Sequence, residues 1–166
     1  MPTNRPSDAS PEPVSPAELD AVLAACRVLV AVSARSLAAV DDTVDLAHFR
    51  ALVVVASRGP MSLGELALAT GMNLSTASRM CDRLVGMDLL DRTDDPANRR
   101  QLRLSLTGAG EKLVARAMDQ RRAALRPMLE HLPKRRRAQL VQLLREFAEA
   151  GGETSHQDLW SLGWAT

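Results

Sequence analysis

The segment 62–107 reads SLGELALATGMNLSTASRMCDRLVGMDLLDRTDDPANRRQLRLSLT, and its successive changes of pattern decide the fold. It opens with Ser62 and Glu65, which have the spacing of a helix capping box. A short helix is therefore expected over 63–69. Gly71 follows as a turn residue, so this first helix is expected to end in a tight turn.

A second helix is predicted directly after that turn. Asn73 or Ser75 is suited to cap it, since both have short side chains that accept a hydrogen bond from a backbone N–H. Apolar residues then recur with helical spacing at Leu74, Ala77, Met80, Cys81, Leu84 and Met87. Two helices joined by a glycine-containing turn are the outline of a helix-turn-helix.

The pattern after this pair of helices is that of a β-hairpin. The segment 89–92 is short and can form an extended strand, and residues 94–98 have the composition of a turn. Residues 101–106 alternate between polar and apolar side chains, which is the period of a half-buried strand. The sequence thus predicts a small wing after the helix-turn-helix.

These segments, taken in order, resemble the MarR family of winged helix-turn-helix regulators. Residues 59–67 resemble the entry to the family's helix-turn-helix, and residues 73–84 resemble its recognition helix. Residues 89–92 and 95–100 resemble the strand before the wing and the wing, and residues 104–110 resemble the start of the dimerisation helix. The resemblance covers residues 17–149, and its specificity lies in the order and spacing of the pieces.

Membership of this family implies a two-fold homodimer built from the first and the last two helices. It implies binding to palindromic operators in double-stranded DNA, usually as a repressor. Many members release DNA on binding a small aromatic or anionic effector, and some respond to cysteine oxidation.

The predicted recognition helix offers the side chains that DNA recognition requires. A helix fits the major groove and meets base edges with its N-terminal half. Arg79 is suited to guanine, whereas Arg83 lies one turn further along and is expected nearer the phosphates. The candidate DNA-binding residues of this helix are Asn73, Ser75, Thr76, Ser78, Arg79 and Arg83.

The predicted wing adds Arg99 and Arg100 to the candidate DNA-binding residues. Either arginine can neutralise a phosphate or enter a narrow minor groove. The family wing usually reads Asp-x-Arg, and Arg100 matches its arginine, but Asn98 stands at the aspartate position. In the family the aspartate helps to hold that arginine. Asn98 can accept a hydrogen bond but carries no charge, so the resemblance implies that Arg100 is held less firmly here.

The flanking sequence predicts a mainly α fold with a helical dimerisation region. Helices are expected over 16–39, 46–57 and 108–131, the last bent or interrupted by Pro127, and from Pro133 to about Gly151. The predicted organisation is a disordered arm over 1–15, a winged-helix domain over 16–150 and a tail over 151–166 that contains Trp160 and Trp164. Within the domain, residues 46–107 form the DNA-binding lobe, and residues 16–40 and 108–150 form the dimerisation helices.

Composition excludes several classes of protein. Aromatic residues make up 2% of the 166 residues, so the core must consist of aliphatic side chains, which favours helices. No phosphate-binding loop, nucleophile motif or metal-spaced histidine cluster is seen, so we expect no enzyme, no catalytic residues, no metal and no cofactor. No secretory signal and no run of about eighteen apolar residues is evident, which favours a cytoplasmic protein without a membrane segment.

Other interpretations remain open at this point. A winged helix can serve as a protein-interaction module without binding an operator. Cys26 or Cys81 could sense oxidation, or could simply pack as small apolar residues. The basic run 134–137 could contact phosphate, or could form an exposed face or salt bridges across a dimer.

Overall fold

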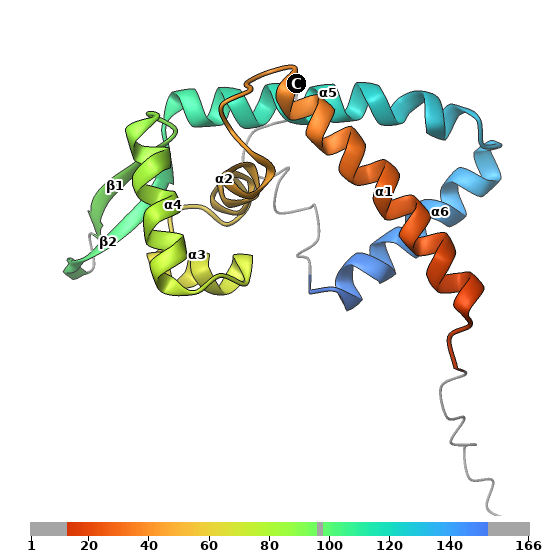
Figure 1. Cartoon of the computed structure of the whole chain (residues 1–166), viewed down its shortest axis with the longest axis horizontal. Helices are drawn as coiled ribbons and strands as arrows, with labels where there is room; N and C mark the ends of the chain where they lie inside the picture. Colours follow the sequence, from red (N-terminus) through yellow and green to blue (C-terminus); the bar gives the residue numbers. More distant parts are fainter. Residues whose placement is uncertain (1–12, 96–97, 153–166) are drawn as a thin grey trace, which may run out of the picture. The chain divides into compact units, whose positions relative to one another are not determined.

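The computed structural model describes residues 13–95 and 98–152, and for residues 95 and 98–101 it describes the backbone alone. The chain divides into two compact units, residues 1–31 and 32–166. The elements are α1 (Pro16–Ala38), α2 (Leu46–Arg58), α3 (Leu63–Thr70), α4 (Leu74–Gly86), β1 (Leu90–Asp95), β2 (Asn98–Leu106), α5 (Gly108–Glu130) and α6 (Lys134–Ala150) (Figure 1). The mainly helical fold with a two-stranded hairpin is the one predicted.

The core of the second unit lies among α2, α3, α4, the hairpin and the first half of α5. Aliphatic side chains fill it, as the scarcity of aromatic residues requires, and Phe49 is the one aromatic side chain of the described residues that is fully buried. The largest completely buried side chains of this core are Phe49, Leu52, Leu66, Leu84 and Leu90. Burial of such side chains is the main source of stability for a lobe of this size.

The hairpin is longer than the sequence indicated. β1 and β2 pair antiparallel, with Leu90 opposite Leu106 and Asp94 opposite Leu102. The turn predicted over 94–98 was therefore too wide, since Asp94, Asp95 and Asn98 belong to the strands. Backbone ladder bonds do not require apolar side chains, so polar composition alone did not mark the end of the strand.

A second backbone contact fastens the hairpin to the loop between α2 and α3. The Met61 N–H donates to the Leu104 carbonyl at 3.1 Å, and the Leu104 N–H donates to the Met61 carbonyl at 2.7 Å. Both side chains are buried. The base of the wing is thus held by the helix-turn-helix itself.

Helix α5 begins at the predicted cap and passes through Pro127. The Thr107 hydroxyl accepts the N–H of Gly110 at 3.0 Å. Pro127 was expected to bend or interrupt the helix, and the interruption does not occur, because the helix continues to Glu130. A proline near the last turn removes one backbone hydrogen bond, which is a smaller loss than in a helix centre with many turns still to follow.

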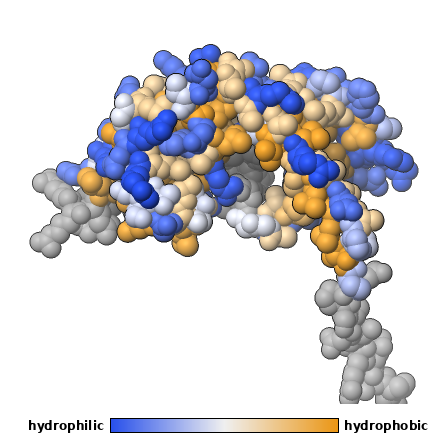
Figure 2. All heavy atoms as spheres, viewed as in Figure 1, coloured by the Kyte–Doolittle hydropathy of each residue, from blue (hydrophilic) through white to orange (hydrophobic). Residues whose placement is uncertain are grey.

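Helix α1 is apolar along much of its length. A capping box at its start joins Ser15 and Glu18, whose carboxylate accepts the Ser15 N–H at 2.7 Å. The side chains of Leu19, Leu23 and Val30 are each more than half exposed in the single chain, and hydrophobic surface follows the helix in Figure 2. By length and composition α1 could cross a membrane, so the expectation that no stretch qualifies was wrong.

Parts of the predicted organisation lie outside the described residues. These are residues 1–12 of the predicted arm and residues 153–166 of the tail, with Trp160 and Trp164.

Candidate nucleic-acid interface

Asn73 begins α4 and fixes the conformation of its first turn. Its side-chain oxygen accepts the backbone N–H of Thr76 and the hydroxyl of Ser75, both at 2.8 Å. Asn73, and not Ser75, is therefore the cap. Because the Asn73 oxygen accepts from the Ser75 hydroxyl, it holds that hydroxyl in a defined place at the exposed end of the helix.

The turn before α4 needs a left-handed residue, and the sequence provides one. Gly71 has a φ of 70° and ends α3, and its N–H donates to the Leu68 carbonyl at 3.2 Å. A side chain is disfavoured in this region of backbone conformation. The capping box of Ser62 and Glu65 at the other end of α3 is also formed, as predicted. Both ends of α3 are thereby fixed by local hydrogen bonds.

Helix α4 has one buried face and one exposed face. Ala77, Cys81 and Leu84 are at most 1% exposed and pack into the core. Since successive residues turn by about 100° in a helix, the opposite face carries different side chains. Of the predicted DNA-binding residues, Asn73, Ser75, Arg79 and Arg83 are exposed, and Thr76 and Ser78 are half-buried.

The structure places the two wing arginines only by their backbone. Arg99 and Arg100 lie near the start of β2, the strand that follows the tip of the hairpin. Their side chains, and that of Asn98, are outside the described part of the chain. The rest of the wing base is fixed by Arg103, whose guanidinium donates to the Pro60 carbonyl at 2.8 Å.

Sequence reasoning missed an ion pair between α4 and β1. The guanidinium of Arg92 lies 2.7 Å from a carboxylate oxygen of Asp82. The two residues are ten positions apart, in a helix and in a strand, so no helical or strand period relates them. The available signal was the presence of opposite charges on either side of a short turn.

The two cysteines have different environments. Cys81 is 0% exposed, and burial raises the pKa of its thiol, although the charge of Arg92 partly opposes this. Cys81 therefore lacks the exposed, acidic thiolate that a redox sensor needs. Cys26, in α1, is exposed. The structure thus contradicts the idea that Cys81 senses oxidation and favours its other interpretation, as a packing residue.

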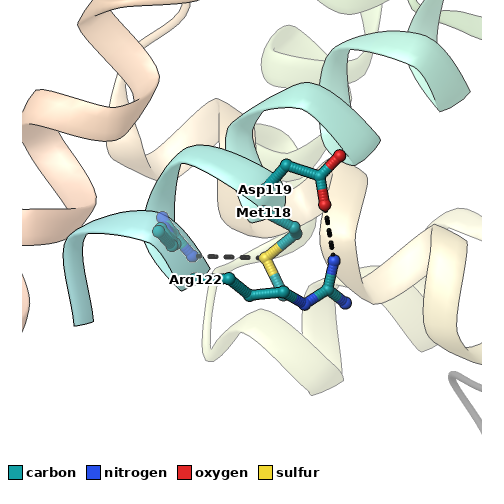
Figure 3. Close-up of polar contacts among 4 residues, drawn as sticks. Met118, Asp119 and Arg122 are labelled. Carbon is teal, nitrogen blue, oxygen red and sulfur yellow. Dashed lines mark hydrogen bonds and ion pairs between the residues drawn. The ribbon is translucent and has the colours of Figure 1, made fainter. Parts of the chain in front are cut away.

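Helix α5 carries a half-buried arginine beside the core. The Arg121 guanidinium carbon lies 4.6 Å from the centroid of the Phe49 ring, and burial lowers the Arg121 pKa. A terminal nitrogen of Arg121 donates to the Met118 sulfur at 3.9 Å, next to the exposed ion pair of Asp119 and Arg122 at 2.8 Å (Figure 3).

The basic run at the start of α6 is exposed throughout. It comprises residues 134–137, and Pro133 precedes it without a side-chain cap. Positive charge is unfavourable at the N-terminus of a helix, so this run does not stabilise α6. No ion pair of this run is recorded within the described residues.

Comparisons with known proteins agree on one family. Residues 43–101, which span the helix-turn-helix and much of the wing, match the MarR family. The chain is 35% identical over 72 residues to YsmB of Bacillus subtilis, a transcriptional regulator of the helix-turn-helix type, and the match covers 43% of this chain and 49% of that protein. The chain thus matches about half the length of YsmB.

Two solved structures extend the similarity over most of the chain. RV1404 from Mycobacterium tuberculosis is 39% identical, with a TM-score of 0.78 over 86% of this chain and 99% of that one. BpsR of Bordetella bronchiseptica, whose DNA binding is regulated by 6-hydroxynicotinic acid, is 25% identical, with a TM-score of 0.62 over 82% of this chain and 98% of that one. With its helix-turn-helix, its wing and these relatives, the chain belongs to the MarR family of winged helix-turn-helix transcription regulators.

Proposed function

We propose that this protein is a transcription regulator, most simply a repressor, that binds a palindromic operator as a homodimer. Helix α4 enters the major groove, and the wing arginines Arg99 and Arg100 contact the adjacent minor groove or phosphates. Residues 46–107 form the DNA-binding lobe. Residues 16–40 and 108–150 form the dimerisation helices.

One observation carries the proposal: the exposed face of α4 presents hydroxyl and guanidinium groups. The helix that presents them is capped at its N-terminus, and its opposite face packs into the core. Ser75 and Arg79 are one turn apart and both exposed, and the Asn73 cap holds the first turn. A guanidinium can donate two parallel hydrogen bonds to guanine. Arg83, one further turn along, is suited to a phosphate.

The homodimer is supported by apolar side chains that the single chain leaves exposed. In α6, Leu143, Leu144 and Phe147 are 51–61% exposed, and no residue of that helix is buried. Large exposed apolar surfaces usually mark a protein interface. The apolar face of α1 is explained in the same way, without a membrane.

Release by a small anionic or aromatic effector is the next part of the proposal. Arg121 offers a suitable group, because its Nε is buried without a hydrogen-bond partner in the part of the chain that the structure describes. A half-buried cation with one N–H donor left unpaired favours an anion that can accept from it. BpsR, whose DNA binding responds to a heteroaromatic acid, provides the precedent in a relative.

The competing proposal is an interaction module that binds no operator. Such a module has no need of Arg79 on the exposed face of α4 or of arginines at the wing. The exposed position of Arg79 therefore favours a DNA-binding regulator. Its proposed location is the cytoplasm.

Selection of bound fragments from random duplex DNA by the full-length protein tests the proposal. Salt is held constant at a moderate concentration, because affinity that depends on phosphate contacts falls steeply as salt rises. We expect an inverted repeat with half-sites about one helical turn apart. Recovery of no sequence above background, with and without small aromatic acids present, would overturn the proposal in favour of the interaction module.

A further inference from the structure

The exposed face of α4 carries an acidic residue where a DNA-reading helix would be expected to be positive. Asp82 lies three residues after Arg79 and beside Arg83, and its side chain is 58% exposed. Its partner Arg92, in β1, has a side chain that is 31% exposed. Resting on the function proposed above, we propose that the Asp82–Arg92 ion pair limits nonspecific DNA binding and thereby sets operator specificity.

Geometry places the pair at the joint between the two DNA-reading elements. A turn of about 100° per residue puts Asp82 on the side of α4 opposite the buried Ala77, one turn after Arg79. Arg92 is the third residue of β1 and lies opposite Leu104 of β2. The ion pair therefore connects the exposed face of the helix to the first strand of the wing.

The energy of this pair points to a role in recognition more than in folding. Water screens the exposed Asp82 carboxylate, and ion pairs at the surface contribute little to the free energy of folding. Next to the phosphates of a duplex, in contrast, each charge changes the affinity for DNA. The carboxylate alone would repel the duplex, and the guanidinium alone would attract any sequence equally.

Paired, the two charges cancel at this position. Arg92 cannot then neutralise a phosphate on unrelated DNA, and Asp82 does not weaken binding to the operator. Discrimination is left to residues that contact base edges, which are Ser75 and Arg79 in the function proposed above. The consequence is that the two single neutralising variants should change nonspecific affinity in opposite directions.

The test compares the wild-type full-length protein with Asp82→Asn, Arg92→Gln and the double variant. Anisotropy titrations over a salt series use the selected inverted repeat and a scrambled duplex of equal length. Asp82→Asn should bind the scrambled duplex about three- to tenfold more tightly, with a salt slope steeper by about 0.9, because it frees one cation. Arg92→Gln should bind both duplexes more weakly. The double variant should return to within about twofold of wild type for the scrambled duplex.

The exposed Asp119–Arg122 pair of α5 provides a matched control, since its charges are also 2.8 Å or less apart but lie outside the reading helix and the wing. Asp119→Asn and Arg122→Gln should leave both affinities unchanged.

A merely structural role for Asp82 and Arg92 would lower the melting temperature and weaken DNA binding in both single variants. That result, or equal nonspecific affinity in all variants, overturns the inference. Failure of the wild-type protein to bind any selected duplex overturns the proposed function itself, so the two failures are distinguishable.

Discussion

The hydroxyl of Thr107 donates to the carbonyl of Asp88 at 2.5 Å and accepts the N–H of Gly110. Asp88 has a φ of 57°, an uncommon value for a residue other than glycine, and lies in the turn that leaves α4. Thr107 thus connects the end of the reading helix to the start of α5. In the proposed dimer, α5 belongs to the dimerisation region, so this joint relates the position of α4 to the position of the partner subunit.

The close approach at this joint leads to a prediction for Gly110. A Cβ at position 110 would lie 2.2 Å from the Leu89 carbonyl oxygen, which is fixed backbone. Gly110→Ala should therefore lower the free energy of unfolding by about 3 kcal/mol or more. Gly108→Ala is the control, because a Cβ there meets nothing within 4 Å. Urea unfolding measures both, and equal stability of the two variants would contradict the packing described.

Asp45, the N-cap of α2, gives a prediction for pH. Desolvation alone would raise its pKa, but hydrogen bonds from the backbone and ring of His48 lower it on balance below the ordinary 3.8. A lowered carboxyl pKa contributes stability above the unfolded value, and that stability is lost as pH falls through the folded value.

Asp45→Ala should thus destabilise the protein by about 1 kcal/mol at pH 7. Its deficit relative to wild type should shrink as pH falls below 3.8. Asp45→Asn keeps the hydrogen-bond acceptor but not the charge, so its stability at pH 7 should lie between those of Asp45→Ala and wild type. Thermal unfolding from pH 7 to pH 3 measures these differences. A deficit in Asp45→Ala that does not change with pH would show that the carboxylate charge plays no part.

The two thiols should react at very different rates. Cys26 is exposed, whereas Cys81 is buried and has a raised pKa. At pH 8 a thiol reagent such as iodoacetamide should label Cys26 readily and Cys81 only after denaturation. Mass spectrometry of Cys26→Ser and Cys81→Ser identifies the labelled residue. Because the proposed dimer covers part of α1, Cys26 should be compared above and below the dissociation concentration, and rapid native labelling of Cys81 would refute its burial.

The exposed apolar residues of α6 lead to a prediction for assembly. Phe147 is 61% exposed in the single chain, so Phe147→Glu should place a charge in the proposed dimer interface. Light scattering at micromolar concentration should find a dimer for wild type and a monomer for this variant. Glu149→Gln, at an exposed polar position of the same helix, is the control. A wild-type monomer would remove α1 and α6 from the proposed interface.

Local signals explain what the sequence predicted well. The caps at Ser62 and Thr107 involve side chains and backbone within three residues, so their geometry is determined by the local sequence. The helical period likewise identified the buried face of α4, including Ala77 and Leu84. These features were sufficient to predict the helix-turn-helix and the wing.

Relationships between distant elements could not be predicted in this way. The Asp82–Arg92 contact depends on how β1 leaves α4. The burial of Cys81 depends on how α4 packs into a core that several elements share. The helical spacing of apolar residues revealed the apolar faces of α1 and α6. This spacing does not indicate which surface covers those faces. Pro127 was overestimated as a break because its effect depends on how much helix follows it.

The most direct test of the central claim, that the exposed face of α4 reads the operator, is a repeat of the DNA selection with Arg79→Ala. Arg116→Ala, an exposed arginine of α5, is the matched control. Arg79→Ala should lose preference for one base pair in each half-site, symmetrically, with a loss of about 1–3 kcal/mol on the selected sequence. The control should recover the wild-type repeat. Base preferences in Arg79→Ala that are identical to wild type at every position would contradict the claim.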